Sequence, residues 1–366
     1  MPGNVFQKDS KIRSIFKDER FLYPEFVPER LPYRDAEIDS LVYALKPVSE
    51  GKKPQNVFLS GRPGTGKTVT AKFVLKELEE YSDRAKFLFI NCFRLNTRHA
   101  VLTEISNFLG VPISRRGTSS DEALDHVLQA FKKISFTPII VFDELDQLFL
   151  EGEASALFYD LLRIFEFSRA RFGIVMISNN EGILLQFDSR VRSSLTPETI
   201  NFLPYSPRQL KEILKERAQF AFFPDSLEED SINVAAAHAS KLGGDCRIAI
   251  ECLLKAGRLA EKQNAEKLSV SHLKEVFSGI EDRAKQKAGP FLTEHEKLIL
   301  ELVPKKGAIA SGGLYKKFSS ASRNPVSQRR FREFVSKLEE KNLLECAFTE
   351  KGVKGRTRMI ALKSRP

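Results

Sequence analysis

One stretch of the sequence has the residue types and spacing that bind phosphate, "GRPGTGKT" at residues 61–68. It matches the pattern GxxxxGK[ST], follows the apolar stretch "NVFLS" and precedes a helical pattern, as this chemistry requires. Glycines let consecutive backbone N–H groups surround phosphate oxygens, and the helix N-terminus adds partial positive charge. A glycine turn with an exposed lysine is the alternative. The context favours a nucleotide site formed by Gly61, Pro63, Gly64, Thr65, Gly66, Lys67, Thr68 and Val69.

Within this site the lysine and threonine have separate tasks. Lys67 is expected to reach the β- and γ-phosphates of ATP, and the hydroxyl of Thr68 to ligate Mg²⁺. Two carboxylates, Asp143 and Glu144, follow the apolar stretch "PIIVF". Ligands of open parallel sheets bind at this end of the strands, so we expect Asp143 to hold the metal through water and Glu144 to polarise the attacking water. Asp146 is expected to cap a helix.

Further polar residues have a nucleotide role and an ordinary role open to them. Asn179 ends the apolar stretch 173–178 and could hold the attacking water or the γ-phosphate, or be a turn residue. Arg247 lies in the first turn of a helix, where a cation opposes the helix dipole, so a phosphate could compensate it, or it could be an ordinary surface arginine. Arg217 lies on an apolar helix face near Tyr205, where the pair could contact a nucleotide or the arginine could snorkel.

Two arginines, Arg190 and Arg192, follow the fourth expected strand. Either could act as an arginine finger toward the nucleotide of a neighbouring subunit, or be a solvated charge.

The elements that must position these residues alternate along the chain. Near-continuous apolar stretches followed by helical patterns predict a parallel sheet covered on both faces. The expected strands are residues 56–60, 86–91, 138–142 and 173–178, and about four helices are expected over 209–283. The scattered cysteines and histidines argue against a zinc site or a disulfide framework. No stretch approaches the roughly 20 apolar residues of a membrane span, and no signal peptide is evident, so we expect a cytoplasmic protein with no membrane partner.

The excess positive charge lies in the C-terminal part of the chain. Residues 285–366 hold 19 lysines and arginines against 8 acidic residues, whereas the remainder holds 39 against 40. Such segregation predicts a polyanion-binding module attached to a neutral body. Helices are expected at 293–303, near 312–318 and at 326–341, followed by two strands around "EKGVKGRTR" at 350–358.

The helix over 326–341 has the pattern of a recognition helix for the DNA major groove. Its apolar residues share one face, and its basic and amide residues lie elsewhere, namely Gln328, Arg329, Arg330 and Arg332. A solvated helix face is the alternative, which the local charge disfavours. The glycines of 350–358 allow a tight hairpin. It would be the wing of a winged helix that enters the minor groove, with the basic residues Lys351, Lys354, Arg356 and Arg358.

These motifs together resemble one family, the archaeal replication initiators, which are single-chain AAA+ relatives of the large subunit of the eukaryotic origin recognition complex and of its replication-licensing partner. The resemblance runs nearly end to end. It includes "FVPERLPYR", "GRPGTGKT", "NCFRLNT", "VFDELD", "ISNN", "FDSRVRSSL", "LPYSPRQLKEIL", "GGDCR", "QRRFREFVSKLEEKNLL" and "GRTR".

The resemblance implies a multidomain α/β fold. It consists of an N-terminal arm, an AAA+ P-loop domain, a helical lid and a C-terminal winged-helix DNA-binding domain, over residues 1–30, 31–204, 205–288 and 289–366. In the family pattern Lys67, Thr68, Asp143 and Glu144 hold and turn over Mg·ATP.

Other positions match family roles. The pattern makes Asn179 and Arg247 sensors of the nucleotide, Tyr205 and Arg217 further nucleotide contacts, and places Tyr33 and Arg34 near the adenine; an insertion that touches DNA contains Arg115 and Arg116.

The resemblance implies an origin-binding initiator that is a weak, Mg²⁺-dependent ATPase with ATP and ADP as alternating ligands. Its implied partners are double-stranded origin DNA, the replicative helicase and a paralogous initiator on adjacent DNA. Two alternatives remain: a clamp-loader or helicase-loader ATPase, and a winged-helix regulator with a weak nucleotide switch. High DNA-stimulated turnover would favour the first, and DNA binding that survives Lys67→Ala would favour the second.

Overall fold

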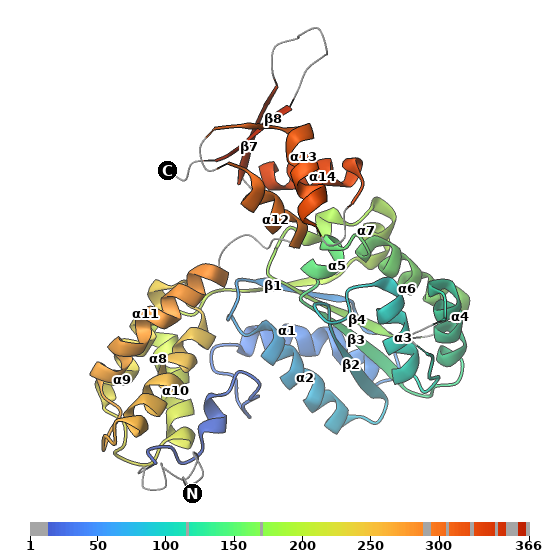
Figure 1. The fold of residues 1–366 in the computed structure, drawn as a ribbon. Helices are drawn as coiled ribbons and strands as arrows, with labels where there is room; N and C mark the ends of the chain where they lie inside the picture. The colour runs from blue at the N-terminus through green and yellow to red at the C-terminus, as the bar shows by residue number, and fades with distance from the viewer. Residues whose placement is uncertain are drawn as a thin grey trace, which may run out of the picture. The chain divides into compact units, whose positions relative to one another are not determined.

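The computed structural model describes residues 14–114, 117–168, 171–287, 294–304, 307–322, 326–340, 343–348 and 358–363. The chain divides into two compact units, one ending at Ala284 and the other beginning at Lys285 (Figure 1). Among the described residues, no helix combines the length and the apolar character needed to cross a membrane.

The first unit is built on a five-stranded parallel sheet. Its strands are β1 (Val57–Gly61), β2 (Ala85–Asn91), β3 (Thr137–Asp143), β4 (Gly173–Ser178) and β5 (Glu198–Phe202), in the order β2-β3-β4-β1-β5. The four expected strands are confirmed. β5 was not anticipated, because it is an edge strand with two buried residues among five and lacks a continuous apolar pattern.

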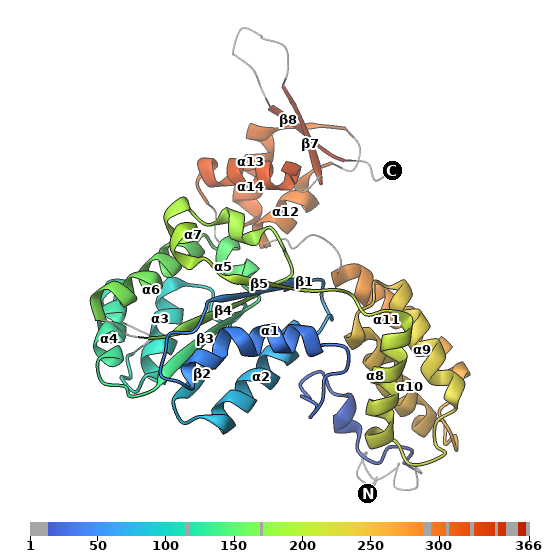
Figure 2. The ribbon, with the colours of Figure 1, turned by 180° about the vertical axis from the view of Figure 1, so that it is seen from behind.

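Helices cover both faces of this sheet, as predicted (Figures 1 and 2). Alternate residues of β1 belong to different cores, Phe58 on one face and Val57 and Leu59 on the other. The elements before the lid are η2 (Glu19–Leu22), α1 (Asp35–Leu45), η3 (Lys46–Val48), α2 (Lys67–Tyr81), α3 (Arg98–Phe108), α4 (Ser120–Phe131), α5 (Asp146–Leu150), α6 (Ala154–Ser168), η4 (Ile183–Gln186) and α7 (Ser189–Leu195).

The rest of this unit is a helical lid with its own core. It contains the four expected helices, α8 (Pro207–Ala221), α9 (Glu229–Lys241), α10 (Cys246–Lys262) and α11 (Val270–Lys287), the last of which continues past the end of the unit at Ala284. α8 begins with a capping box in which Ser206 and Gln209 satisfy each other's backbone N–H groups. This capped start of α8 comes directly after residues 203–206, which connect β5 to the lid.

The described part of the N-terminal segment is incorporated into the lid core. Ile15 and Phe16 are buried there, and the ring of Phe16 stacks on Phe222 with centroids 4.9 Å apart. A Cβ added to Gly257 of α10 would lie 2.3 Å from the ring of Phe16, so the glycine makes room for that ring. The lid is therefore completed by residues that precede the whole P-loop domain in the sequence.

The second unit is a winged helix. Its elements are α12 (Glu294–Leu302), β6 (Ile309–Ala310), α13 (Ser311–Ala321), α14 (Gln328–Glu340), β7 (Leu344–Phe348) and β8 (Arg358–Leu362). The antiparallel sheet has the order β6-β8-β7, and its short β6 was not anticipated. Phe331, Val335 and Leu338 form the buried face of α14. The hairpin residues 349–357 lie outside the described residues.

Removal of the Phe16 ring should destabilise the first unit. We expect Phe16→Ala to lower its free energy of unfolding by about 3–5 kcal/mol, because a buried aromatic ring is replaced by a cavity. Equilibrium urea unfolding followed by circular dichroism measures this change. Tyr43→Ala is the control, since that side chain is 76% exposed and should cost less than about 0.5 kcal/mol. A similarly small effect for Phe16→Ala would contradict the proposed packing.

Candidate nucleotide and DNA sites

The P-loop connects β1 to α2 and holds Lys67 in a buried position. Gly66, at φ +97°, is the N-terminal cap residue of α2 and permits a turn that a residue with a side chain would strain. The ammonium group of Lys67 donates to Gly61 O at 2.7 Å, Arg62 O at 2.9 Å and Asn179 Oδ1 at 2.9 Å. Burial lowers the pKa of Lys67 to about 8. The negative charge of a phosphate would stabilise the charged form of this desolvated lysine.

The two carboxylates after β3 lie beside this lysine. Asp143 Oδ1 accepts from the Thr68 hydroxyl at 3.1 Å, and Glu144 Oε2 accepts from Asn179 Nδ2 at 3.0 Å. Burial raises the pKa of both carboxyl groups, and the neighbouring acidic residues raise that of Glu144 further. Glu144 also has a φ of +56°, a conformation that costs a non-glycine residue roughly 1–2 kcal/mol.

These oxygens fit a magnesium ion. Mg²⁺ prefers oxygen ligands and is usually bound by one or two protein groups together with substrate phosphates. The Thr68 hydroxyl and the Asp143 carboxylate are such ligands, and a cation there would relieve the raised pKa of the buried carboxyl.

Asn179 and Asp146 link the end of β4 to this centre. The side chain of Asn179 contacts both Lys67 and Glu144, and its expected role toward the attacking water or the γ-phosphate stays a prediction. The expected role of Asp146 as a helix cap was wrong. It is the first residue of α5, and its carboxylate accepts from Ser178 Oγ at 3.0 Å and from the backbone N–H of Asn179 at 3.4 Å. It thereby holds the strand end that presents Asn179.

The start of α10 in the lid contacts the P-loop directly. The backbone N–H of Cys246 donates to Gly64 O at 3.2 Å, and Asp245 lies where a side chain at Gly64 would be. Arg247 is in the first turn of α10, as expected, and its guanidinium pairs with Asp245, Nη2 to Oδ2 at 3.0 Å. Sequence reasoning missed Asp245. An aspartate before a helix signals a cap, but no local signal predicts its contact with the P-loop.

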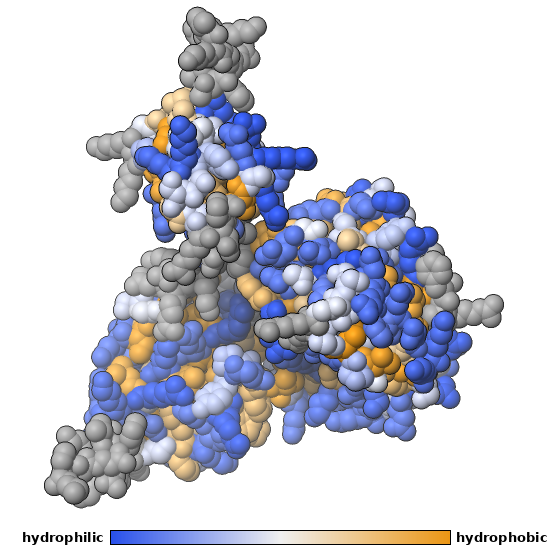
Figure 3. All heavy atoms as spheres, turned by 45° about the vertical axis from the view of Figure 1, so that its right-hand side comes forward, coloured by the Kyte–Doolittle hydropathy of each residue, from blue (hydrophilic) through white to orange (hydrophobic). Residues whose placement is uncertain are grey.

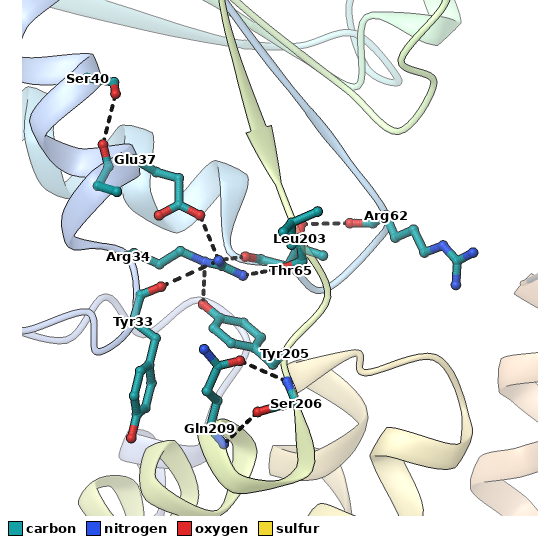
Figure 4. A network of polar contacts seen from close by, with 11 residues as sticks. Tyr33, Arg34, Glu37, Ser40, Arg62, Thr65, Leu203, Tyr205, Ser206 and Gln209 are labelled. Atoms are coloured by element: carbon teal, nitrogen blue, oxygen red, sulfur yellow. Dashed lines mark hydrogen bonds and ion pairs between the residues drawn. The ribbon is translucent and has the colours of Figure 1, made fainter.

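Three of the other expected nucleotide contacts, Tyr33, Arg34 and Tyr205, lie near the junction of the P-loop domain and the lid. Arg34 donates to Thr65 O of the P-loop and to the Tyr205 hydroxyl, while the neighbouring Tyr33 is 39% exposed (Figure 4). Burial raises the pKa of Tyr205 to about 12.

Arg217 is held by the N-terminal segment. Its Nη1 donates to Phe21 O at 2.9 Å, and its guanidinium lies 4.7 Å from the ring centroid of Phe26. Burial lowers its pKa. These contacts explain why an arginine lies on an apolar face of α8 without requiring a ligand, so its nucleotide contact stays a prediction.

The two candidate finger arginines lie on α7 in different environments. Arg190 is exposed. Its Nη2 lies 3.6 Å from Asp188 Oδ2, and its guanidinium lies over the ring of Tyr159. Arg192 borders a small apolar hollow lined also by Leu184, Leu185, Phe187, Leu195 and Pro197. Neither arrangement tests action on a second subunit.

On α14 of the second unit, the predicted basic residues do not all share one face. Gln328, Arg329 and Arg332 line a shallow hollow together with Glu333 and Ser336. Arg330 lies outside this group, about 200° around the helix from Gln328 at 100° per residue. Arg329 and Glu333 form an exposed ion pair, Nε to Oε1 at 3.5 Å, which contributes little energy and can yield to phosphate.

Hydrophilic residues dominate much of the surface visible in Figure 3.

Arg358 is the one predicted wing residue among those described. Its guanidinium donates to Glu339 Oε2 at 2.6 Å and to Ser336 Oγ at 3.2 Å, both on α14. It therefore ties β8 to the helix. The other predicted contacts, Arg115, Arg116, Lys351, Lys354 and Arg356, lie outside the described residues.

Affinity for ADP should fall as the pH rises above 8. Phosphate charge raises the pKa of Lys67 from its value of about 8 in the free site, so the complex binds more protons than its components. Linkage then predicts that the dissociation constant rises by up to about tenfold per pH unit above this pKa. Calorimetric titrations in two buffers with different ionisation enthalpies measure the accompanying proton uptake. Lys67→Ala should bind weakly and lose this uptake; uptake that persists in the variant would contradict the assignment.

Two family models match the first unit. One is an AAA domain, matched by residues 50–183, and the other is the lid domain of Cdc6 AAA+ ATPase type, matched by residues 211–278. The first range holds the P-loop and both carboxylates, and the second holds Arg217 and Arg247.

Similar proteins cover nearly the whole chain. An ORC1-type DNA replication protein of Thermococcus kodakarensis is 33% identical over 100% of this chain and 92% of its own length. A second, from Methanosarcina acetivorans, is 32% identical over 96% of this chain and 94% of its own. The solved structure of the Aeropyrum pernix ORC1 protein in complex with DNA is 30% identical, covers 96% of this chain and 94% of its own, and has a TM-score of 0.73. The chain belongs to the family of ORC1-type DNA replication proteins.

Proposed function

We propose that this protein is an ATP-regulated DNA-binding protein that recognises replication origins and initiates DNA replication. The observation that carries the proposal is the combination in one chain of a P-loop site, a lid in contact with it, and a winged-helix unit with basic residues on α14. The Aeropyrum pernix relative, solved in complex with DNA, supports the DNA-binding part. Loading of the replicative helicase and action beside a paralogous initiator belong to the same proposal, as does a nucleoid location.

The geometry suggests how the residues would divide the hydrolysis of ATP. P-loop N–H groups and Lys67 bind the phosphates, and Asn179 orients Lys67 and Glu144 toward one another. Glu144 accepts the proton of the attacking water. Mg²⁺, held by Thr68 and Asp143, would neutralise charge on the β- and γ-phosphates. Arg247 would leave Asp245 for a phosphate of the nucleotide, and hydrolysis would act as a switch.

Glu144→Gln should separate nucleotide binding from hydrolysis. The amide keeps the shape of the side chain and can still accept from Asn179, but it cannot take up a proton, so turnover should fall about 10²- to 10⁴-fold with ATP affinity nearly retained. Steady-state phosphate release and equilibrium ATP binding measure the two effects. Glu151→Gln, an exposed residue after α5, should change neither. Unaltered turnover in Glu144→Gln would contradict the assignment of the base.

For the DNA, α14 would present Gln328, Arg329 and Arg332 to the major groove. Arg115, Arg116, Lys351, Lys354 and Arg356 are proposed as further contacts, mainly to phosphates. Because Arg358 is bound to Glu339, its proposed contribution is to hold the wing strand against the helix, with any DNA contact made from that position.

Footprinting on genomic fragments that flank the protein's own gene, with ATP and with ADP, tests the function itself. Preferential protection of a defined sequence in one nucleotide state is expected. Binding to such fragments that is no tighter than binding to random duplex across a salt titration would refute origin recognition.

Arg332→Ala should weaken DNA binding more than loss of a positive charge elsewhere on the unit. A base contact would cost about 1–3 kcal/mol on the protected sequence, whereas a phosphate contact would lower the salt slope by about one on any sequence. Fluorescence anisotropy over a range of salt concentrations distinguishes the two. Lys297→Ala, an exposed lysine on α12, removes the same charge and should have a small effect. Equal losses in both variants would contradict a special role for the α14 face.

A further inference from the structure

Arg34 is a buried arginine that uses its guanidinium to join segments far apart in the sequence. It is 4% exposed, and each of its three side-chain nitrogens has a protein partner. Nε donates to Thr65 O at 2.9 Å and to the Tyr205 hydroxyl at 3.0 Å. Nη1 donates to Glu37 Oε1 at 2.8 Å, and Nη2 to Leu203 O at 2.8 Å. The start of α1, the P-loop and the connection from β5 to the lid thus meet at one cation (Figure 4).

The bond to Thr65 orients the P-loop. In a trans peptide the carbonyl and the following N–H point in opposite directions, so holding Thr65 O outward directs the N–H of Gly66 to the other side. The preceding carbonyl, Gly64 O, is held in the same manner by the N–H of Cys246 in the lid. Two successive P-loop amides are therefore aimed by groups that lie outside the loop.

The same arginine also contacts the lid. Its guanidinium lies 4.0 Å from the ring centroid of Tyr205, a residue that belongs to the hydrophobic core of the lid. Space around Tyr205 is tight, because a Cβ on Gly66 would lie 2.8 Å from its hydroxyl and one on Gly244 would lie 2.7 Å from its carbonyl. A shift of Tyr205 would therefore displace both the P-loop and the loop that begins α10.

The backbone before Arg34 is itself strained. Tyr33 has a φ of +64°, which costs a residue with a side chain roughly 1–2 kcal/mol. In Figure 4 its ring points away from the guanidinium, so this conformation serves to turn the chain and bring Arg34 into the interior.

We propose that Arg34 is a positioning residue that couples nucleotide binding at the P-loop to the angle of the lid. It acts through Thr65, Leu203 and Tyr205 rather than through contact with the nucleotide. Phosphates that bind the amide groups of the P-loop shift Thr65, and Arg34 passes this shift to the connection that carries the lid. The inference rests on the proposed function, in which ATP controls the protein.

Arg34→Lys tests this coupling, because it keeps the positive charge and loses the fork that spans three carbonyl and carboxylate partners. Hydrogen exchange of the full chain, with and without a saturating non-hydrolysable ATP analogue, reports the P-loop and residues 203–206 separately. In the wild type the analogue should slow exchange at the P-loop and at residues 203–206. In Arg34→Lys we expect about tenfold weaker binding and, at saturation, slowing at the P-loop with loss of the response at 203–206.

Tyr205→Phe removes the hydroxyl and keeps the ring under Arg34, so it should reduce the response at 203–206 less than Arg34→Lys does. If Arg34→Lys melts at a lower temperature than the wild type, Tyr205→Phe still tests the proposal. Arg258→Lys, an exposed arginine paired with Glu19 in the lid, is the control and should respond like the wild type.

A wild-type response in Arg34→Lys at saturating analogue would overturn the coupling while leaving the proposed function intact. A wild type that binds the analogue without any change at 203–206 would also overturn only the coupling, whereas a wild type that binds no analogue would overturn the ATP-regulated function on which the inference rests.

Discussion

The constraint on which the rest of the first unit depends is that all five strands of its large sheet run parallel. The carboxyl ends of β1, β3 and β4 therefore meet at one edge, and each delivers a different group to it. β1 leads into the P-loop, β3 ends with the carboxylates, and β4 is followed by Asn179. Because β4 lies between β1 and β3, its asparagine is placed to reach Lys67 on one side and Glu144 on the other. The site is thus a consequence of strand order.

This centre concentrates charges that burial does not favour. Lys67 has a lowered pKa and both carboxyl groups have raised ones, each because of desolvation. Such opposing shifts are costly in an empty site and are relieved when phosphates and a cation enter it. Ligand binding therefore changes the electrostatic environment of Lys67, Asp143 and Glu144 together. The contacts from Arg34 and Cys246 to successive P-loop carbonyls connect neighbouring elements to this centre.

In the winged-helix unit, the arginines differ in the partners that they contact. Arg358 is bound to α14 through Ser336 and Glu339, whereas Arg332 stays free of such a bond among the contacts described. The "GRTR" sequence thus begins with a residue outside the described part and ends with one that supports the fold. A motif rich in arginine need not direct every guanidinium toward DNA.

By itself the sequence determined the elements with strong local signals. Four core strands, the lid helices and the helices of the winged helix follow from apolar periodicity, and the P-loop and the two carboxylates follow from motif and context. β5, β6 and the burial of Ile15 and Phe16 escaped it, because short edge strands and isolated apolar residues carry no periodic pattern.

Tertiary structure alone decided which partners the arginines have. Arg34, Arg217 and Arg358 all read as ligand contacts, and all three bind backbone or side chains far away in the sequence. The physical reason is that a guanidinium can donate hydrogen bonds to phosphate, carboxylate and carbonyl oxygens alike. Which of these lies within hydrogen-bonding distance depends on how remote segments pack, and a local pattern of residues does not contain that information.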